Sequence, residues 1–96
     1  MEAPFAHVLH QETIERLADG RALQRGKAYA DRGHVKELDK SAARLRGLVQ
    51  GTVLYDVSIW VKGEGLGYSC SCPAGAEGDF CKHCVAVALV WLERGT

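Results

Sequence analysis

The chain contains the stretch Cys70-Ser-Cys-Pro-Ala-Gly-Ala-Glu-Gly-Asp-Phe-Cys-Lys-His-Cys84, which holds all four of its cysteines and one of its four histidines. Zinc binds thiolate and imidazole ligands in a tetrahedron, and ligands that lie close together in sequence let a short loop surround the ion. The stretch is therefore predicted to bind Zn2+. A chain of 96 residues buries a modest core, so a metal that binds only the folded form would stabilise it.

Five side chains in this stretch compete for four ligand positions. One choice is Cys70, Cys72, Cys81 and His83, and the other replaces His83 by Cys84. The spacing Cys-x-x-Cys is common in zinc sites, whereas Cys-x-His is unusual, so spacing by itself favours four cysteines. In the first choice Cys84 is a small buried residue on the helix that follows. The residues alone leave both choices open.

Two stretches of helical periodicity precede the cysteines. Apolar residues recur at helical spacing over residues 10–18 and again over residues 21–31, and Gly20 and Gly33 follow as stop signals. Residues 80–94 are rich in Val, Ala and Leu without a breaker, which predicts a buried C-terminal helix capped by Asp79. We therefore expect two N-terminal helices within about 10–32 and one helix at the end.

Between these helices the apolar period changes from 3.6 to two. Small and apolar residues alternate with polar ones over residues 45–51 and 55–61, and a glycine-rich turn at 62–65 follows. The pattern predicts antiparallel strands within about 34–70, the last of which delivers Cys70 and Cys72. The expected fold is α+β in a single domain over residues 1–96: two helices, a small antiparallel sheet, and a zinc knuckle with its helix at 70–94.

Charge is unevenly distributed, although the net charge is zero. Residues 16–46 hold nine basic and four acidic residues, whereas residues 1–15 and 47–96 hold more acids than bases. Glu77 and Asp79 add negative charge beside the thiolate ligands, so the zinc loop is acidic overall. We therefore expect a nucleic acid to avoid the loop and to bind residues 16–46, through Arg21, Arg25, Arg32, Arg44 and Arg46.

The arrangement Cys-x-Cys, eight residues, Cys-x-His resembles the SWIM-type zinc finger. The runs Arg25-Gly-Lys-Ala-Tyr29 and Val49-Gln-Gly-Thr-Val-Leu-Tyr55 also resemble the upstream helix and strands of its bacterial members. The resemblance implies that the ligands are Cys70, Cys72, Cys81 and His83, and we adopt that set. SWIM domains occur in helicase-like ATPases, transposases and recombination proteins. The resemblance implies DNA binding or, alternatively, docking onto an ATPase or recombination partner.

Other functional classes find little support in the residues. A filled Cys3His site leaves no position for water or substrate, and no acid, base and nucleophile cluster stands out, so we expect no enzyme and no small-molecule substrate. No apolar run reaches the length of a membrane span, and the first residues lack a signal peptide, so we expect a cytoplasmic protein without membrane contact. For a protein partner, the candidate contacts are Trp60 and Leu54.

Overall fold

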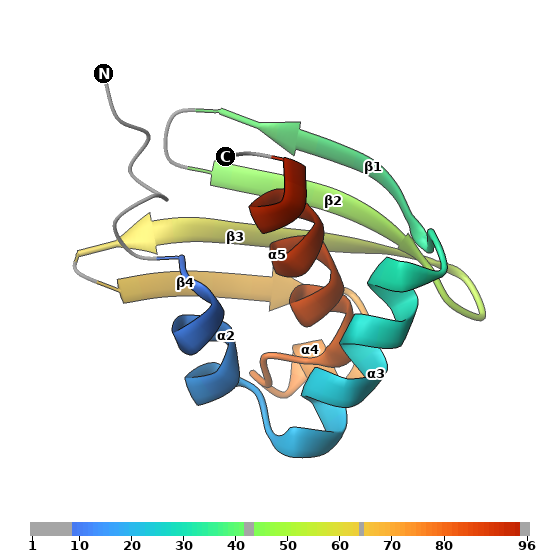
Figure 1. Ribbon diagram of the computed structural model, residues 1–96, viewed down its shortest axis with the longest axis horizontal. Coiled ribbons are helices and arrows are strands. Elements are labelled where there is room, and N and C mark those ends of the chain that lie inside the picture. The colour runs from blue at the N-terminus through green and yellow to red at the C-terminus, as the bar shows by residue number, and fades with distance from the viewer. Residues whose placement is uncertain (1–8, 42–43, 64, 95–96) are drawn as a thin grey trace.

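The structure, a computed structural model, describes residues 9–41, 44–63 and 65–94 (Figure 1). The fold is α+β, as predicted, and its four-stranded sheet is antiparallel throughout. In chain order its elements are α2 (Gln11–Leu17), α3 (Gly20–Asp31), β1 (Val35–Lys40), β2 (Arg44–Gln50), β3 (Leu54–Lys62), β4 (Gly65–Cys70), α4 (Pro73–Ala76) and α5 (Lys82–Arg94).

The strands follow one another across the sheet in the order β1-β2-β3-β4, and their alternation gives the sheet two different faces. Leu45, Val49 and Ile59 are fully buried on the inner face. Arg44 and Trp60 pair across β2 and β3 on the outer face, where no helix of the described residues packs. The period of two in the sequence therefore predicted which side chains form the core.

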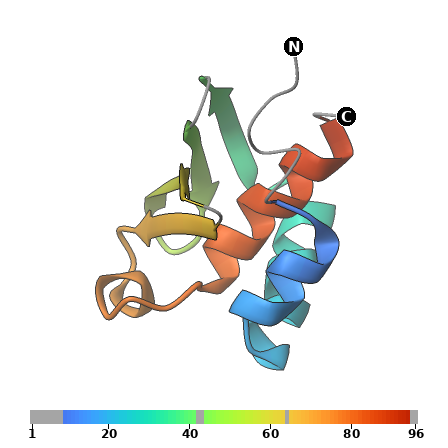
Figure 2. The same cartoon turned by 90° about the vertical axis from the view of Figure 1, so that its left-hand side faces the viewer.

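Helix α5 lies between the sheet and the other two long helices (Figure 2). Two glycines permit this close packing. A methyl group on Gly26 of α3 would overlap the Val85 side chain of α5, and one on Gly47 of β2 would lie 2.7 Å from the Val87 side chain on another side of the same helix. Residues 83–88 of α5 are all buried, which explains why this segment is apolar almost all round.

The start of α5 differs from the prediction. The helix begins at Lys82 rather than near residue 80, and the Cys81 carbonyl accepts the backbone N–H of Val85. The residue before the helix is therefore Cys81, and the prediction that Asp79 occupies the capping position is wrong. Helix α4 was not predicted either, because four residues carry no periodicity that sequence reasoning could detect. None of the described helices combines the length and apolar character of a membrane span.

Candidate metal centre

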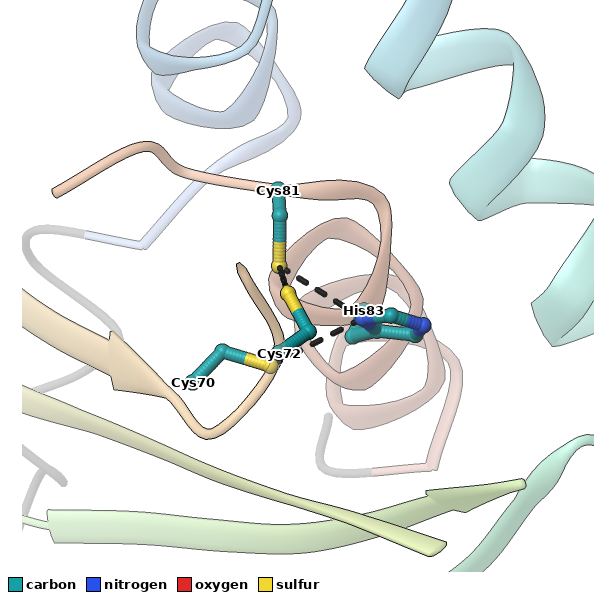
Figure 3. A group of neighbouring side chains, drawn as sticks. All are labelled: Cys70, Cys72, Cys81 and His83. Atoms are coloured by element: carbon teal, nitrogen blue, oxygen red, sulfur yellow. Dashed lines mark hydrogen bonds between the residues drawn. The ribbon is translucent and has the colours of Figure 1, made fainter. Parts of the chain in front are cut away.

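Four side chains meet where β4 ends and α5 begins (Figure 3). Cys70 is the last residue of β4, Cys72 immediately precedes α4, Cys81 immediately precedes α5, and His83 lies in the first turn of α5. All four are at least 94% buried. The four side chains therefore meet where the end of β4 lies next to the start of α5.

The distances within this cluster fit a single zinc ion. The four ligand atoms lie within 4.8 Å of one another. The Nδ1 of His83 is 3.6 Å from the Cys70 Sγ and 3.7 Å from the Cys81 Sγ, and the Sγ atoms of Cys72 and Cys81 are 3.6 Å apart. An ion about 2.3 Å from sulfur and about 2.0 Å from nitrogen separates its tetrahedral ligand atoms by about 3.5–3.8 Å. The cluster therefore suits Zn2+, as predicted.

Cys84 lies beside the cluster and outside it. Its Sγ is 3.9 Å from the Cys81 Sγ, but it does not belong to the group whose ligand atoms all lie within 4.8 Å. Its side chain is fully buried in the core with Val85 and Ala88. The structure thus brings together the four residues that the family resemblance implied, with Cys84 packed next to them.

Helix α4 contributes backbone groups that sequence reasoning missed. Pro73 occupies its first turn, and the backbone N–H of Gly75 donates to the Cys72 Sγ at 3.3 Å. A side chain on Gly75 would overlap the carbonyl and Cβ of Cys70. The glycine therefore lets α4 fold back against the end of β4, and its amide stabilises negative charge on Cys72.

The thiols of the cluster differ in acidity. Hydrogen bonding with Cys70, and secondly with Cys84, lowers the pKa of Cys81 because both contacts stabilise its thiolate. The contact with Cys81, together with burial, raises the pKa of Cys70. Cys81 therefore deprotonates more readily than Cys70, and the thiolate is the form that binds a metal.

Aromatic rings surround the His83 side chain. The ring of Tyr55 on β3 lies 4.5 Å from the imidazole centroid, and that of Tyr29 on α3 meets it edge-on at 5.4 Å. The Nε2 atom is buried near Gly51 of the β2–β3 connection and has no hydrogen-bond partner among the residues that the structure describes. The Nδ1 atom instead faces the Cys70 and Cys81 sulfurs, which matches a ring that uses this nitrogen as its metal ligand. Alternation placed Tyr55 on the inner face, but no sequence signal linked it to His83.

Two of the predicted nucleic-acid contacts lie close to the metal centre. Arg21 and Arg25 of α3 line a cavity of about 170 Å³ together with Lys82 of α5 and the cluster residues Cys72, Cys81 and His83. The acids Asp19 and Asp79 line it too, and the Asp19 carboxylate accepts the backbone N–H of Ala22 at 2.7 Å. The zinc loop and the basic segment, which the sequence treated as separate regions, are thus neighbours.

The five predicted arginines do not share one surface. Arg21, Arg25 and Arg32 lie on α3 or at its end, whereas Arg44 and Arg46 project from the outer face of β2, away from α5. Arg46 forms an ion pair with Asp56 at 3.2 Å. The positive charge of residues 16–46 is therefore divided between two faces, because strand alternation turns Arg44 and Arg46 away from the helices.

Residues 55–92 match the family model described as SWIM zinc finger. The chain carries a SWIM zinc finger. No curated protein and no solved structure matched the chain. The SWIM segment runs from β3 through most of α5 and includes the whole Cys/His cluster. Helix α3 and strands β1 and β2 lie outside the match, so the resemblance of those upstream residues to bacterial members stays a prediction.

Proposed function

We propose that this SWIM zinc finger is a DNA-binding module. In this proposal Cys70, Cys72, Cys81 and His83 ligate one Zn2+, and phosphates are contacted by the α3 basic row, which we define as Arg21, Arg25 and Arg32. The observation that supports it is the exposure of these three arginines on α3 and at its end.

The ion has a structural role in this proposal. Three thiolates and one imidazole fill a tetrahedral site, so the ion joins the end of β4 to the start of α5 and takes no part in chemistry. Because α5 begins at Lys82, the ion also fixes that side chain beside α3, where its Nζ lies 5.8 Å from the Tyr29 ring centroid. We therefore expect no enzymatic activity, and a reducing compartment such as the cytoplasm, where the four free cysteines stay available.

The α3 basic row has the dimensions of a phosphate-contacting surface. Its three arginines are exposed, and within the part of the chain that the structure describes none of them forms an ion pair. At about 100° per residue they fall on one edge of the helix, over a length of about 16 Å. A DNA duplex carries one phosphate per about 1.7 Å of its axis, so this row can face several phosphates without reading the sequence.

The test is a fluorescence-anisotropy titration of a labelled DNA duplex with zinc-loaded protein between about 50 and 200 mM salt. Each phosphate contact contributes about −0.9 to the slope of log K against log salt, so Arg21→Ala, Arg25→Ala and Arg32→Ala combined should reduce its magnitude by up to about 2.7. Arg94→Ala, at the far end of α5, is the matched control and should leave the slope unchanged. An unchanged slope in the triple variant would disprove the assignment.

A protein-docking module is the second candidate function. Val53 and Leu54, beside the β2–β3 connection, are the exposed large hydrophobic residues among those described, with 56% and 49% of their surfaces accessible. An ATPase or a recombination factor is the partner class implied by the family resemblance. This candidate predicts a complex that resists nuclease and moderate salt and is lost on Leu54→Ser. If the complex persists in the Leu54→Ser variant, the assignment of Val53 and Leu54 as the docking surface is disproved.

A further inference from the structure

The outer face of the sheet carries a tryptophan in an unusual setting. One register line crosses three strands and pairs Arg44 with Trp60 and Trp60 with Gly67. A side chain at position 67 would overlap the indole, so the ring lies directly against the backbone of β4. The Arg44 guanidinium stands over the same ring, with its carbon 5.0 Å from the ring centroid. We call these three residues the Trp60 platform.

The surroundings of the platform are flat and positively charged. The residues of β4 that share this face are Gly65, Gly67 and Ser69, so no large side chain rises beside the indole. Lys62, which pairs with Gly65, adds a second exposed cation. The nearest carboxylate on β3, that of Asp56, is held by Arg46 in the ion pair described above. The acids of β1 on this face lie across β2 from the indole, and the nearer one, Asp39, lines a shallow cavity with Arg44 and Arg46.

We propose that the Trp60 platform binds single-stranded nucleic acid by stacking one base on the indole or on the guanidinium above it. Arg44 and Lys62 then contact the flanking phosphates. The proposal rests on the nucleic-acid-binding function proposed above and adds a second, separate surface to it. Bases stack on aromatic rings and on arginine planes, and only a single strand exposes base faces, because a duplex keeps them inside.

The distribution of apolar surface favours a nucleotide over a protein at this position. Leu54 shares the outer face of β3, but it lies six residues from Trp60, about 20 Å along the strand. The Arg46–Asp56 ion pair occupies the face between them. The platform is therefore a single aromatic ring between cations rather than a continuous hydrophobic patch, and stacking between flanking cations is how proteins hold single strands.

The experiment compares two single-stranded probes of equal length and phosphate number, an oligo-dT and its abasic analogue, together with a duplex. Stacking of one base should make the zinc-loaded protein bind oligo-dT at least about fivefold more tightly than the abasic strand. Trp60→Leu should abolish this preference while zinc content and duplex binding stay unchanged. Leu54→Ala, on the same face of the same strand, is the matched control and should retain the preference. Arg44→Gln tests the platform without altering the indole and should weaken oligo-dT binding.

The outcomes separate this proposal from the proposed function. Loss of duplex binding in the Arg21, Arg25 and Arg32 triple variant, with no oligo-dT preference in the unmodified protein, supports the α3 basic row and overturns the platform. A Trp60-dependent preference that survives in the triple variant supports the platform, and the α3 assignment is contradicted when that variant also keeps the salt slope of duplex binding. A preference for oligo-dT that survives Trp60→Leu overturns the platform. A self-association of the protein that Trp60→Leu abolishes also overturns it, because it assigns this face to a second copy of the chain.

Discussion

Replacing Gly26 by alanine tests the close contact between α3 and α5. The new methyl group would overlap the Cβ and Cγ1 of Val85 and lie 2.8 Å from the backbone oxygen of Lys82. Neither neighbour is the end of a flexible side chain, because Val85 is fully buried and the other atom belongs to the backbone. The helices α3 and α5 must therefore move apart to accept the methyl group.

The magnitude follows from two opposing terms. Overpacking of a buried contact costs about 1–3 kcal/mol, and the severity of this overlap places the cost at the upper end of that range. Alanine stabilises a helix by about 1 kcal/mol relative to glycine. Gly26→Ala should therefore lower the free energy of unfolding by about 2 kcal/mol, which corresponds to roughly 8–16 °C in Tm for a domain of this size.

The assay is urea unfolding of the protein in excess zinc, with the slope m checked for two-state behaviour. Gly20→Ala is the matched control, since a methyl group there meets no atom within 4 Å, and its stability should be unchanged or slightly raised. Because the displaced segment includes Lys82, next to the cluster residue His83, Gly26→Ala should also weaken zinc binding in a chelator competition. A Gly26→Ala protein as stable as the Gly20→Ala control would refute the packing argument.

Three further predictions concern the metal centre. His83→Ala should weaken zinc binding by more than about 100-fold, because loss of a residue that only supports a ligand already costs up to about that much. Cys84→Ala should retain zinc and lower the free energy of unfolding by about 1 kcal/mol. Equal zinc loss in the two variants would favour the four-cysteine site. Tyr55→Leu should weaken zinc binding about tenfold in a chelator competition by releasing the His83 ring, and an unchanged affinity would show that the ring is fixed without it. Chelation with EDTA should abolish the near-ultraviolet circular dichroism of the protein, because metal binding and folding share one free energy; a spectrum unchanged after zinc removal would contradict this coupling.

The sequence predicted the elements that depend on local patterning. Alternation over residues 45–49 and 55–61 identified the buried face of β2 and β3, since a strand turns successive side chains to opposite faces. The apolar run after residue 80 identified α5, because a helix buried all round leaves no polar stripe. The choice between His83 and Cys84 depended on family resemblance, because both residues suit zinc.

The features that sequence reasoning missed depend on contacts between distant segments. Helix α4 requires Gly75 to approach the backbone of Cys70. Four residues are too few to show a helical period, so the sequence does not predict this contact. Arg25 and Lys82 meet at one cavity because Gly26 brings α3 and α5 together, although 57 positions separate the two cations in sequence. The arginines of α3 and those of β2 likewise lie on different faces of the molecule. The sequence does not show this separation, because it depends on how the helix and the strand pack in the tertiary fold.

The turn between the two ligand pairs offers a place for chain insertion. Residues 77–79 are exposed, and Gly78 adopts a positive φ of 92° that ends the turn after α4. Eight residues separate Cys72 from Cys81, and doubling a flexible loop costs only about 0.6 kcal/mol of closure entropy. An eight-residue peptide tag placed between Gly78 and Asp79 should therefore leave both ligand pairs in place, and it would give the module an attachment point.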